Sequence, residues 1–112
     1  MNFIIIYTTC SSEDEAKQIS KTLLDHDLIA CSNILPTTLS MFKWDNNIST
    51  QNECTIFLKT IEENYDAVSV LIKENHAYER PCIISIPIKN IDKDFGEWIY
   101  NCLLYTSPSP RD

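Results

Sequence analysis

The chain has 112 residues, of which 44% are hydrophobic, and its formal net charge is −7. This length and apolar content suffice for one domain with one modest core. The acidic balance and the lack of a lysine and arginine cluster argue against nucleic acid as a partner, because such binding depends on neutralising phosphates. No apolar run approaches the roughly 20 residues of a membrane-spanning helix, so we expect no membrane partner.

The cysteine pattern and the first residues bear on the cellular compartment. The five cysteines are Cys10, Cys31, Cys54, Cys82 and Cys102. Their spacing fits neither a disulfide framework nor a zinc-binding CxxC pattern. The apolar segment 3–7 lacks the basic residues and the cleavage site of a signal peptide. We therefore expect free thiols and a cytoplasmic protein.

The chain begins with a predicted strand and helix. Residues 2–9 are mostly β-branched or aromatic and predict a strand that is apolar on both faces. Ser12 and Glu15 form a capping-box pattern, which predicts a helix ending near residues 25–27. The apolar stripe of this helix consists of Ala16, Ile19 and Leu23.

A long hairpin is predicted next. A strand at 28–34 is interrupted by Pro36 and continues at 39–44. Residues 45–47, Asp-Asn-Asn, favour a turn, and residues 48–60 return as the third strand. We expect this hairpin to project beyond the body of the domain.

The second half repeats the strand and helix order. Thr60 and Glu63 form another capping-box pattern before a predicted helix that leads to His76. A fourth strand is expected at 82–88, a loop at 90–94, and then a short third helix. The apolar stripes of these two helices are Tyr65, Val68, Leu71 and Ile72, and then Phe95, Trp98, Ile99 and Cys102.

The order βαββαβ with a further helix predicts an α+β, ferredoxin-like sandwich. Two crossover helices cover only one face of a four-stranded sheet. The first and fourth predicted strands are nevertheless apolar on both faces, so another surface must cover the second face. From this patterning we infer a homo-oligomer.

The turn 76–81, His-Ala-Tyr-Glu-Arg-Pro, carries the densest set of reactive side chains. Pro81 restricts the backbone of Arg80, so the turn is expected to be rigid. A rigid loop rich in His, Tyr and Glu suits metal or polar small-molecule binding. In the alternative interpretation, His76 only caps a helix and Tyr78 only packs its ring.

Five segments, in order, resemble the CutA divalent-cation-tolerance family. They are residues 28–34 (Leu-Ile-Ala-Cys-Ser-Asn-Ile), 40–45 (Ser-Met-Phe-Lys-Trp-Asp), 59–60 (Lys-Thr), 76–83 (His-Ala-Tyr-Glu-Arg-Pro-Cys-Ile) and 95–99 (Phe-Gly-Glu-Trp-Ile). The third and fourth resemble the family's Lys-Thr pair and its His-Pro-Tyr-Glu-x-Pro-Glu-Ile signature. The resemblance covers most of residues 3–101.

The resemblance implies a non-enzymatic homotrimer, formed through its long hairpins, that acts in tolerance of divalent metal ions. It implies weak copper or similar metal binding with Cys31 and His76 as candidate ligands, which agrees with the affinity of thiolate and imidazole for copper. It also implies a ligand cleft between subunits. The candidate cleft residues are Trp44, Lys59, His76, Tyr78 and Glu79.

Each of these sites has a structural alternative. Cys31 is equally explained as a small buried hydrophobe, and Trp44 as an interface anchor. Lys59 in an apolar strand needs a partner, for which Glu79 is the candidate. Two residues depart from the signature: Ala77 replaces a proline, and Cys82 replaces a glutamate, which exchanges a hard oxygen donor for a soft sulfur. At Cys82, a core position is the alternative to ligation.

Two other functions compete with metal tolerance. The same architecture occurs in PII-type signalling proteins, which it resembles, and Lys59, Arg80 and His76 would then contact an anionic metabolite. A scaffold that anchors protein partners is the third possibility. Catalysis is poorly supported, since no nucleophile motif surrounds Cys10 or Cys31.

The end of the chain changes character. Residues 1–101 are expected to form the CutA-like domain, and 102–112 a non-native or disordered tail. The Ser-Pro-Ser-Pro run at 107–110 cannot form a helix. This tail resembles translated adapter sequence, which is best kept out of fold reasoning.

Overall fold

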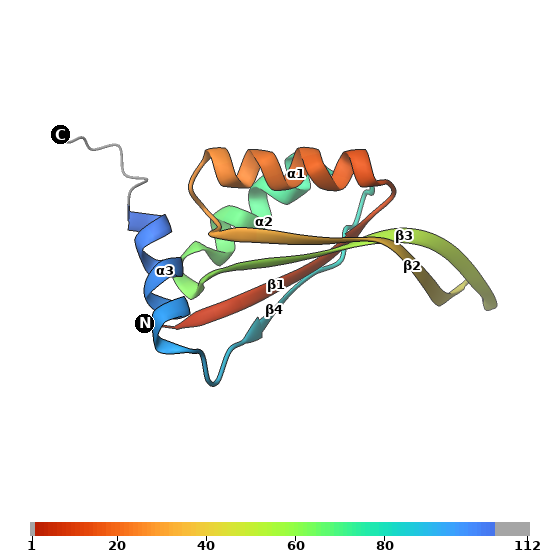
Figure 1. The fold of residues 1–112 in the computed structure, drawn as a ribbon. Coiled ribbons are helices and arrows are strands. Elements are labelled where there is room, and N and C mark those ends of the chain that lie inside the picture. The colour runs from red at the N-terminus through yellow and green to blue at the C-terminus, as the bar shows by residue number, and fades with distance from the viewer. Residues whose placement is uncertain (1, 105–112) are drawn as a thin grey trace.

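The computed structural model describes residues 2–104 (Figure 1). The strands are β1 (Phe3–Cys10), β2 (Cys31–Trp44), β3 (Asn47–Ile61) and β4 (Ile83–Pro87). The helices are α1 (Glu13–Asp25), the 3₁₀ turn η1 (Glu62–Asn64), α2 (Tyr65–Glu74) and α3 (Lys93–Leu104). The predicted order and the ferredoxin-like α+β class are confirmed.

One antiparallel sheet has the strand order β2-β3-β1-β4, so β2 and β4 are its edges. Helices α1 and α2 lie side by side against one face (Figure 1). The hairpin β2–β3 extends beyond them, as predicted, and α3 lies at the opposite end of the sheet. No helix within residues 2–104 is long and apolar enough to cross a membrane.

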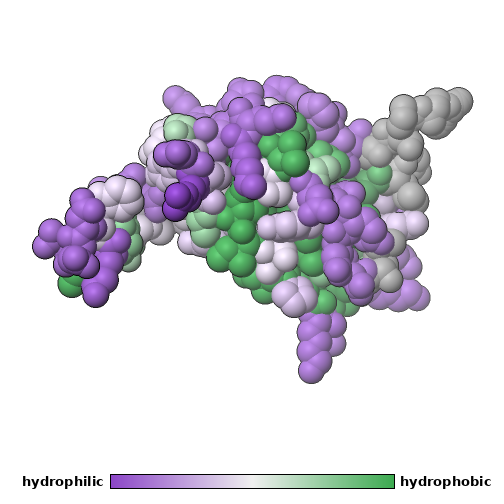
Figure 2. All heavy atoms as spheres, turned by 180° about the vertical axis from the view of Figure 1, so that it is seen from behind, coloured by the Kyte–Doolittle hydropathy of each residue, from purple (hydrophilic) through white to green (hydrophobic). Residues whose placement is uncertain are grey.

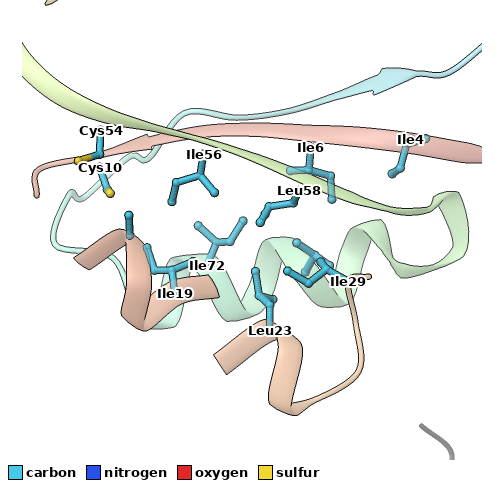
Figure 3. Packing of buried hydrophobic residues seen from close by; sticks show 12 residues of the cluster. Ile4, Ile6, Cys10, Ile19, Leu23, Ile29, Cys54, Ile56, Leu58 and Ile72 are labelled. Carbon is cyan, nitrogen blue, oxygen red and sulfur yellow. The ribbon is translucent and has the colours of Figure 1, made fainter. Parts of the chain in front are cut away.

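The core lies between this helical layer and the sheet (Figure 3). Alternate residues of β1 and β3 point toward the helices, as the period of a strand requires. The fully buried members include Ile6, Ile56 and Leu58 from the sheet and Ile19, Leu23 and Ile72 from the helices. The predicted apolar stripes of α1 and α2 are therefore confirmed.

The N-terminus of α1 is capped as the sequence predicts. The Ser12 hydroxyl accepts the backbone N–H of Glu15 at 3.1 Å. The Glu15 carboxylate reaches back to the N–H of Ser11 at 3.0 Å. The second predicted capping box is wrong. Thr60 is still part of β3, its hydroxyl donates to the Leu28 carbonyl at 2.6 Å, and α2 has no side-chain cap.

The hairpin differs from its prediction mainly at its start. β2 begins at Cys31, three residues later than expected, and runs without a break past Pro36. The edge position tolerates a residue without an N–H, and the register shifts between Leu35 and Thr38. At the tip, Asp45 and Asn46 have φ of 51° and 64°. Positive φ at both central residues matches the twist of a tight hairpin.

The end of the domain also differs from its prediction. The expected boundary after residue 101 falls inside α3, which continues to Leu104. Leu103 is buried with Ile99 and Ala30 in a second small core. The remainder of the expected tail, residues 105–112, lies outside the described residues.

The second face of the sheet carries apolar side chains that no helix of residues 2–104 covers along its length. Register places Ile84 and Ile86 of β4 beside Tyr7 and Ile5 of β1, on the side away from α1 and α2. Ile84 is 51% exposed and Ile86 is 46% exposed. We call this uncovered face of the sheet the open face. Seen from behind, the body of the molecule shows hydrophobic surface bordered by hydrophilic side chains (Figure 2).

Candidate functional site

The turn after α2 is organised by the buried imidazole of His76, whose side chain is fully inaccessible. The backbone N–H of Tyr78 donates to its Nδ1 at 3.0 Å, and Nε2 lies 2.7 Å from the Thr9 carbonyl. Since Nδ1 accepts, the ring proton resides on Nε2, which donates to Thr9. Both ring nitrogens are therefore engaged within the chain.

Glu15 joins this turn to the start of α1. Its Oε2 accepts the backbone N–H of Ala77 at 2.6 Å, and its Oε1 accepts the Ser11 hydroxyl at 2.7 Å. Burial opposes ionisation, but these hydrogen bonds and the one from the Ser11 N–H outweigh it and lower the pKa of Glu15. The ionised carboxylate therefore fixes the position of the turn.

Tyr78 joins the turn to the hairpin. Its hydroxyl donates to Glu53 Oε2 at 2.7 Å and accepts from the Gln51 side chain at 2.8 Å. The other oxygen of Glu53 accepts the Ser40 hydroxyl at 2.7 Å. Burial, together with the hydrogen bond and negative charge of Glu53, raises the pKa of Tyr78. The phenol therefore keeps its proton and acts as a donor.

A pocket of about 470 Å³ lies between the turn and the hairpin. Its walls are Trp44, Gln51, Tyr78, Glu79 and Arg80. The aromatic rings, the guanidinium and the carboxylate give it donors and acceptors suited to a polar ligand of modest size.

The structure brings together four of the five predicted cleft residues. Trp44, Tyr78 and Glu79 line the pocket, and the His76 ring packs behind Tyr78 with centroids 4.7 Å apart. Lys59 lies elsewhere on the sheet. The expected Lys59–Glu79 pair is wrong, because the Lys59 amine donates to the Asn33 side chain at 2.7 Å.

The two predicted metal ligands occupy separate places in one chain. Cys31 is half-buried at the start of β2, in register with Lys59 and hence with Ile5. His76 instead contacts Thr9, four residues farther along β1. The described part of the chain contains no group of three or more His, Cys, Asp or Glu residues placed to hold a metal ion. The donors of a single chain therefore do not fit a closed metal site.

Cys82 is not part of the core. The side chain is exposed, because the residue precedes β4 instead of opening it as a buried member.

The sequence patterns do not reveal the carboxylates that hold the site together. The capping-box spacing predicts Glu15 as a helix cap, and the same carboxylate also binds Ala77. Glu53 and Gln51 belong to none of the patterns found in the sequence. The available signal was Glu53 itself, a charged residue directly before the buried Cys54 of a strand, since such a charge needs a partner.

Comparison with known proteins defines the family. A model of the CutA1 divalent ion tolerance protein family matches residues 4–102. The chain belongs to the CutA1 family. This confirms the resemblance inferred from the five ordered segments.

Relatives within the CutA1 family are similar over most of the chain. The divalent-cation tolerance protein CutA of Archaeoglobus fulgidus is 40% identical over 94 residues, which are 84% of this chain and 91% of that protein. The chloroplastic CutA 1 protein of rice is 32% identical over 88% of this chain. The matched region spans 55% of the length of the rice protein.

Solved CutA structures share the fold. The crystal structure of the divalent ion tolerance protein CutA1 from Ehrlichia chaffeensis is 34% identical, with a TM-score of 0.87, and the match covers 91% of this chain and 95% of that one. The periplasmic divalent cation tolerance protein CutA from Archaeoglobus fulgidus is 37% identical, also with a TM-score of 0.87, over 90% of this chain and 98% of that one.

Proposed function

We propose that this CutA1-family protein acts in tolerance of divalent metal ions as a non-enzymatic homotrimer that binds copper or a similar ion weakly. The observation that carries the proposal is the family match over residues 4–102, together with relatives named for divalent-cation tolerance. The compartment varies among relatives, whose names include chloroplastic and periplasmic proteins. A cytoplasmic location stays a prediction.

The open face supports the oligomer. Exposed isoleucines on β4 and the partly buried Tyr7 and Phe57 form a surface too apolar for a sheet that faces only water. A second and third copy of the chain would cover it and pair the free edge of β2. Light scattering tests this part, and a monomer at micromolar concentration would contradict it.

Cys31 supports the metal part, because its half-buried thiol lies on the open face, where neighbouring chains would supply further donors. A thiolate suits copper(I). His76 is the second proposed ligand, and its ligation requires release of the bond to Thr9 or to Tyr78.

Calorimetric titration of the full chain with copper(I) and with zinc, under reducing conditions, tests the metal role. We expect saturable binding that Cys31→Ser weakens at least tenfold and that Cys82→Ser, the matched exposed thiol, leaves unchanged. If His76 is also a ligand, His76→Ala weakens binding as well. Absence of binding, or binding indifferent to Cys31→Ser, would refute it.

The pocket favours a second candidate function, a PII-like sensor of a small anionic molecule. Its specific support is the guanidinium of Arg80 on a wall whose Tyr78 is already fixed by Glu53 and Gln51. A thermal-shift screen discriminates the two functions. Stabilisation by carboxylate or phosphate metabolites, lost in Arg80→Gln, would favour the sensor, whereas stabilisation by metals alone would exclude it.

A further inference from the structure

Two cysteines outside the proposed metal site lie opposite each other on neighbouring strands of the sheet. Cys10 ends β1, Cys54 lies in β3, and the two are direct partners in the antiparallel register. They are 0% and 2% exposed and belong to the same core cluster. Figure 3 shows their sulfur atoms next to one another at one end of that core.

The register also shows whether Cys10 and Cys54 are a hydrogen-bonded or a non-hydrogen-bonded pair of the two strands. The Glu62 N–H donates to the Asn2 carbonyl at 2.8 Å, one step before the Phe3–Ile61 pair. Hydrogen-bonded pairs recur at every second residue, so Cys10 and Cys54 form one of them. The Cα atoms of such a pair are about 5.5 Å apart, inside the range of about 4.4–6.8 Å that a disulfide bridges.

We propose that Cys10 and Cys54 are a redox modification site, which a small peroxide converts to a reversible cross-strand disulfide. The Cβ atoms of directly opposed residues are about 4.5–5.5 Å apart, and they are closest in pairs without hydrogen bonds. Relaxed disulfides need about 3.5–4.5 Å. The bond between Cys10 and Cys54 is therefore strained, and strained disulfides are the readily reduced ones.

The two thiols take different steps of the oxidation, because Cys54 borders a pocket that a peroxide can enter. A pocket of about 260 Å³ between the N-terminus of α1 and the hairpin has Cys54 in its wall. The Cys54 thiolate attacks one peroxide oxygen, the O–O bond breaks, and a sulfenic acid and water result. The Cys10 sulfur then displaces the sulfenic oxygen as a second water and forms the S–S bond. Two thiols and one peroxide thus give one disulfide and two waters.

The surroundings keep this site reduced under mild conditions. Burial, and to a lesser extent the charge of Glu15, raises the pKa of Cys10 to about 11. Burial and the negative charges of Glu13 and Glu15 raise that of Cys54. Because the thiolate is the nucleophile, the oxidation rate is expected to rise roughly tenfold per pH unit from neutral pH toward these pKa values.

The pair of Cys10 and Cys54 lies between the two carboxylates that fix the candidate binding turn. Cys10 directly precedes Ser11, which binds Glu15, and Cys54 directly follows Glu53, which binds Tyr78. Pulling β1 and β3 together at this point therefore acts on both supports of the pocket.

The test uses the full chain with Cys31→Ser, Cys82→Ser and Cys102→Ser, which leaves only Cys10 and Cys54. After hydrogen peroxide, denaturation and alkylation, we expect both thiols to be lost in uncrosslinked chains and recovered by dithiothreitol. The matched variants Cys54→Val and Cys10→Ala in this background keep one cysteine each. They should therefore form no disulfide within the chain. Two thiols that stay titratable, bridges between chains only, or irreversible oxidation would overturn the proposal. Because Cys31 is absent throughout, the outcome does not depend on the proposed metal role.

Discussion

The two faces of the sheet are built from the same kinds of residue but reach different environments. On the helical face, Ile6, Ile56 and Leu58 are fully buried under α1 and α2. On the open face, Ile84 and Ile86 remain about half exposed. The first face is completed by the chain itself, whereas the second needs another surface. The contrast shows that one layer is completed within the chain, and it leaves the other as the surface that the proposed assembly would cover.

The largest effect is expected on the open face. Replacing both Ile84 and Ile86 with aspartate places two charges where a partner would bury them, which is strongly unfavourable. We expect the proposed trimer to dissociate to the 12.9 kDa chain in sedimentation velocity. Val70→Asp is the control, since Val70 is similarly exposed on α2 and should leave the mass unchanged. A double variant that remains trimeric would remove the open face from the interface.

On the helical face, Leu58→Ala should destabilise the fold by about 2–5 kcal/mol, because it leaves a cavity among residues that relax only partly. Urea unfolding at a fixed protein concentration measures this loss. Val70→Ala, on the exposed side of α2, should cost roughly 0.5 kcal/mol or less. Equal losses at the two positions would contradict the assignment of the core to one face.

The third prediction concerns Glu15, which ties the end of the sheet to the binding turn. Glu15→Gln removes the charge behind its hydrogen bonds to Ser11 and Ala77 and should cost about 1–3 kcal/mol at neutral pH. Glu13→Gln is the matched control on the same helical turn. Its exposed ion pair with Lys17 is expected to contribute only about 0.5 kcal/mol or less.

The pH dependence of the unfolding free energy tests whether the charge of Glu15 causes this loss. The pKa of Glu15 is lower in the folded state than its ordinary value of 4.5. Its contribution is therefore present above that value and is lost as pH falls through the folded pKa. The stability gap between the parent chain and Glu15→Gln should close below pH 4.5. A stability difference that stays constant down to acidic pH would mean that the carboxylate charge is not the cause.

Periodicity was enough to predict the layers of this fold. The alternation of β3 and the stripes of α1 and α2 depend on local spacing, which the sequence displays directly. Thr60 shows where local patterns fail. Its capping-box spacing with Glu63 is real, but the hydroxyl is used by Leu28, which lies far away in sequence. The end of α3 was missed for a similar reason, since Leu103 gains its burial from the distant Ala30.

The candidate site was predictable in its centre but not in its supports. The turn 76–81 was recognised from its residue types, and Trp44 from the resemblance. The carboxylates of Glu15 and Glu53 reach the turn across 62 and 25 residues of sequence. Such pairings depend on the register of β1, β3 and the turn together. A single sequence does not contain that register explicitly.

The edge position of β2 has a consequence for the newly made chain. Before assembly, the outer backbone donors and acceptors of this 14-residue strand are free to template growth of an open-ended sheet. Pro36 offers no N–H, and the register shift beside it bends the ladder, so the edge is divided into two shorter stretches. The same irregularity that interrupts the predicted strand therefore acts against open-ended aggregation at this edge.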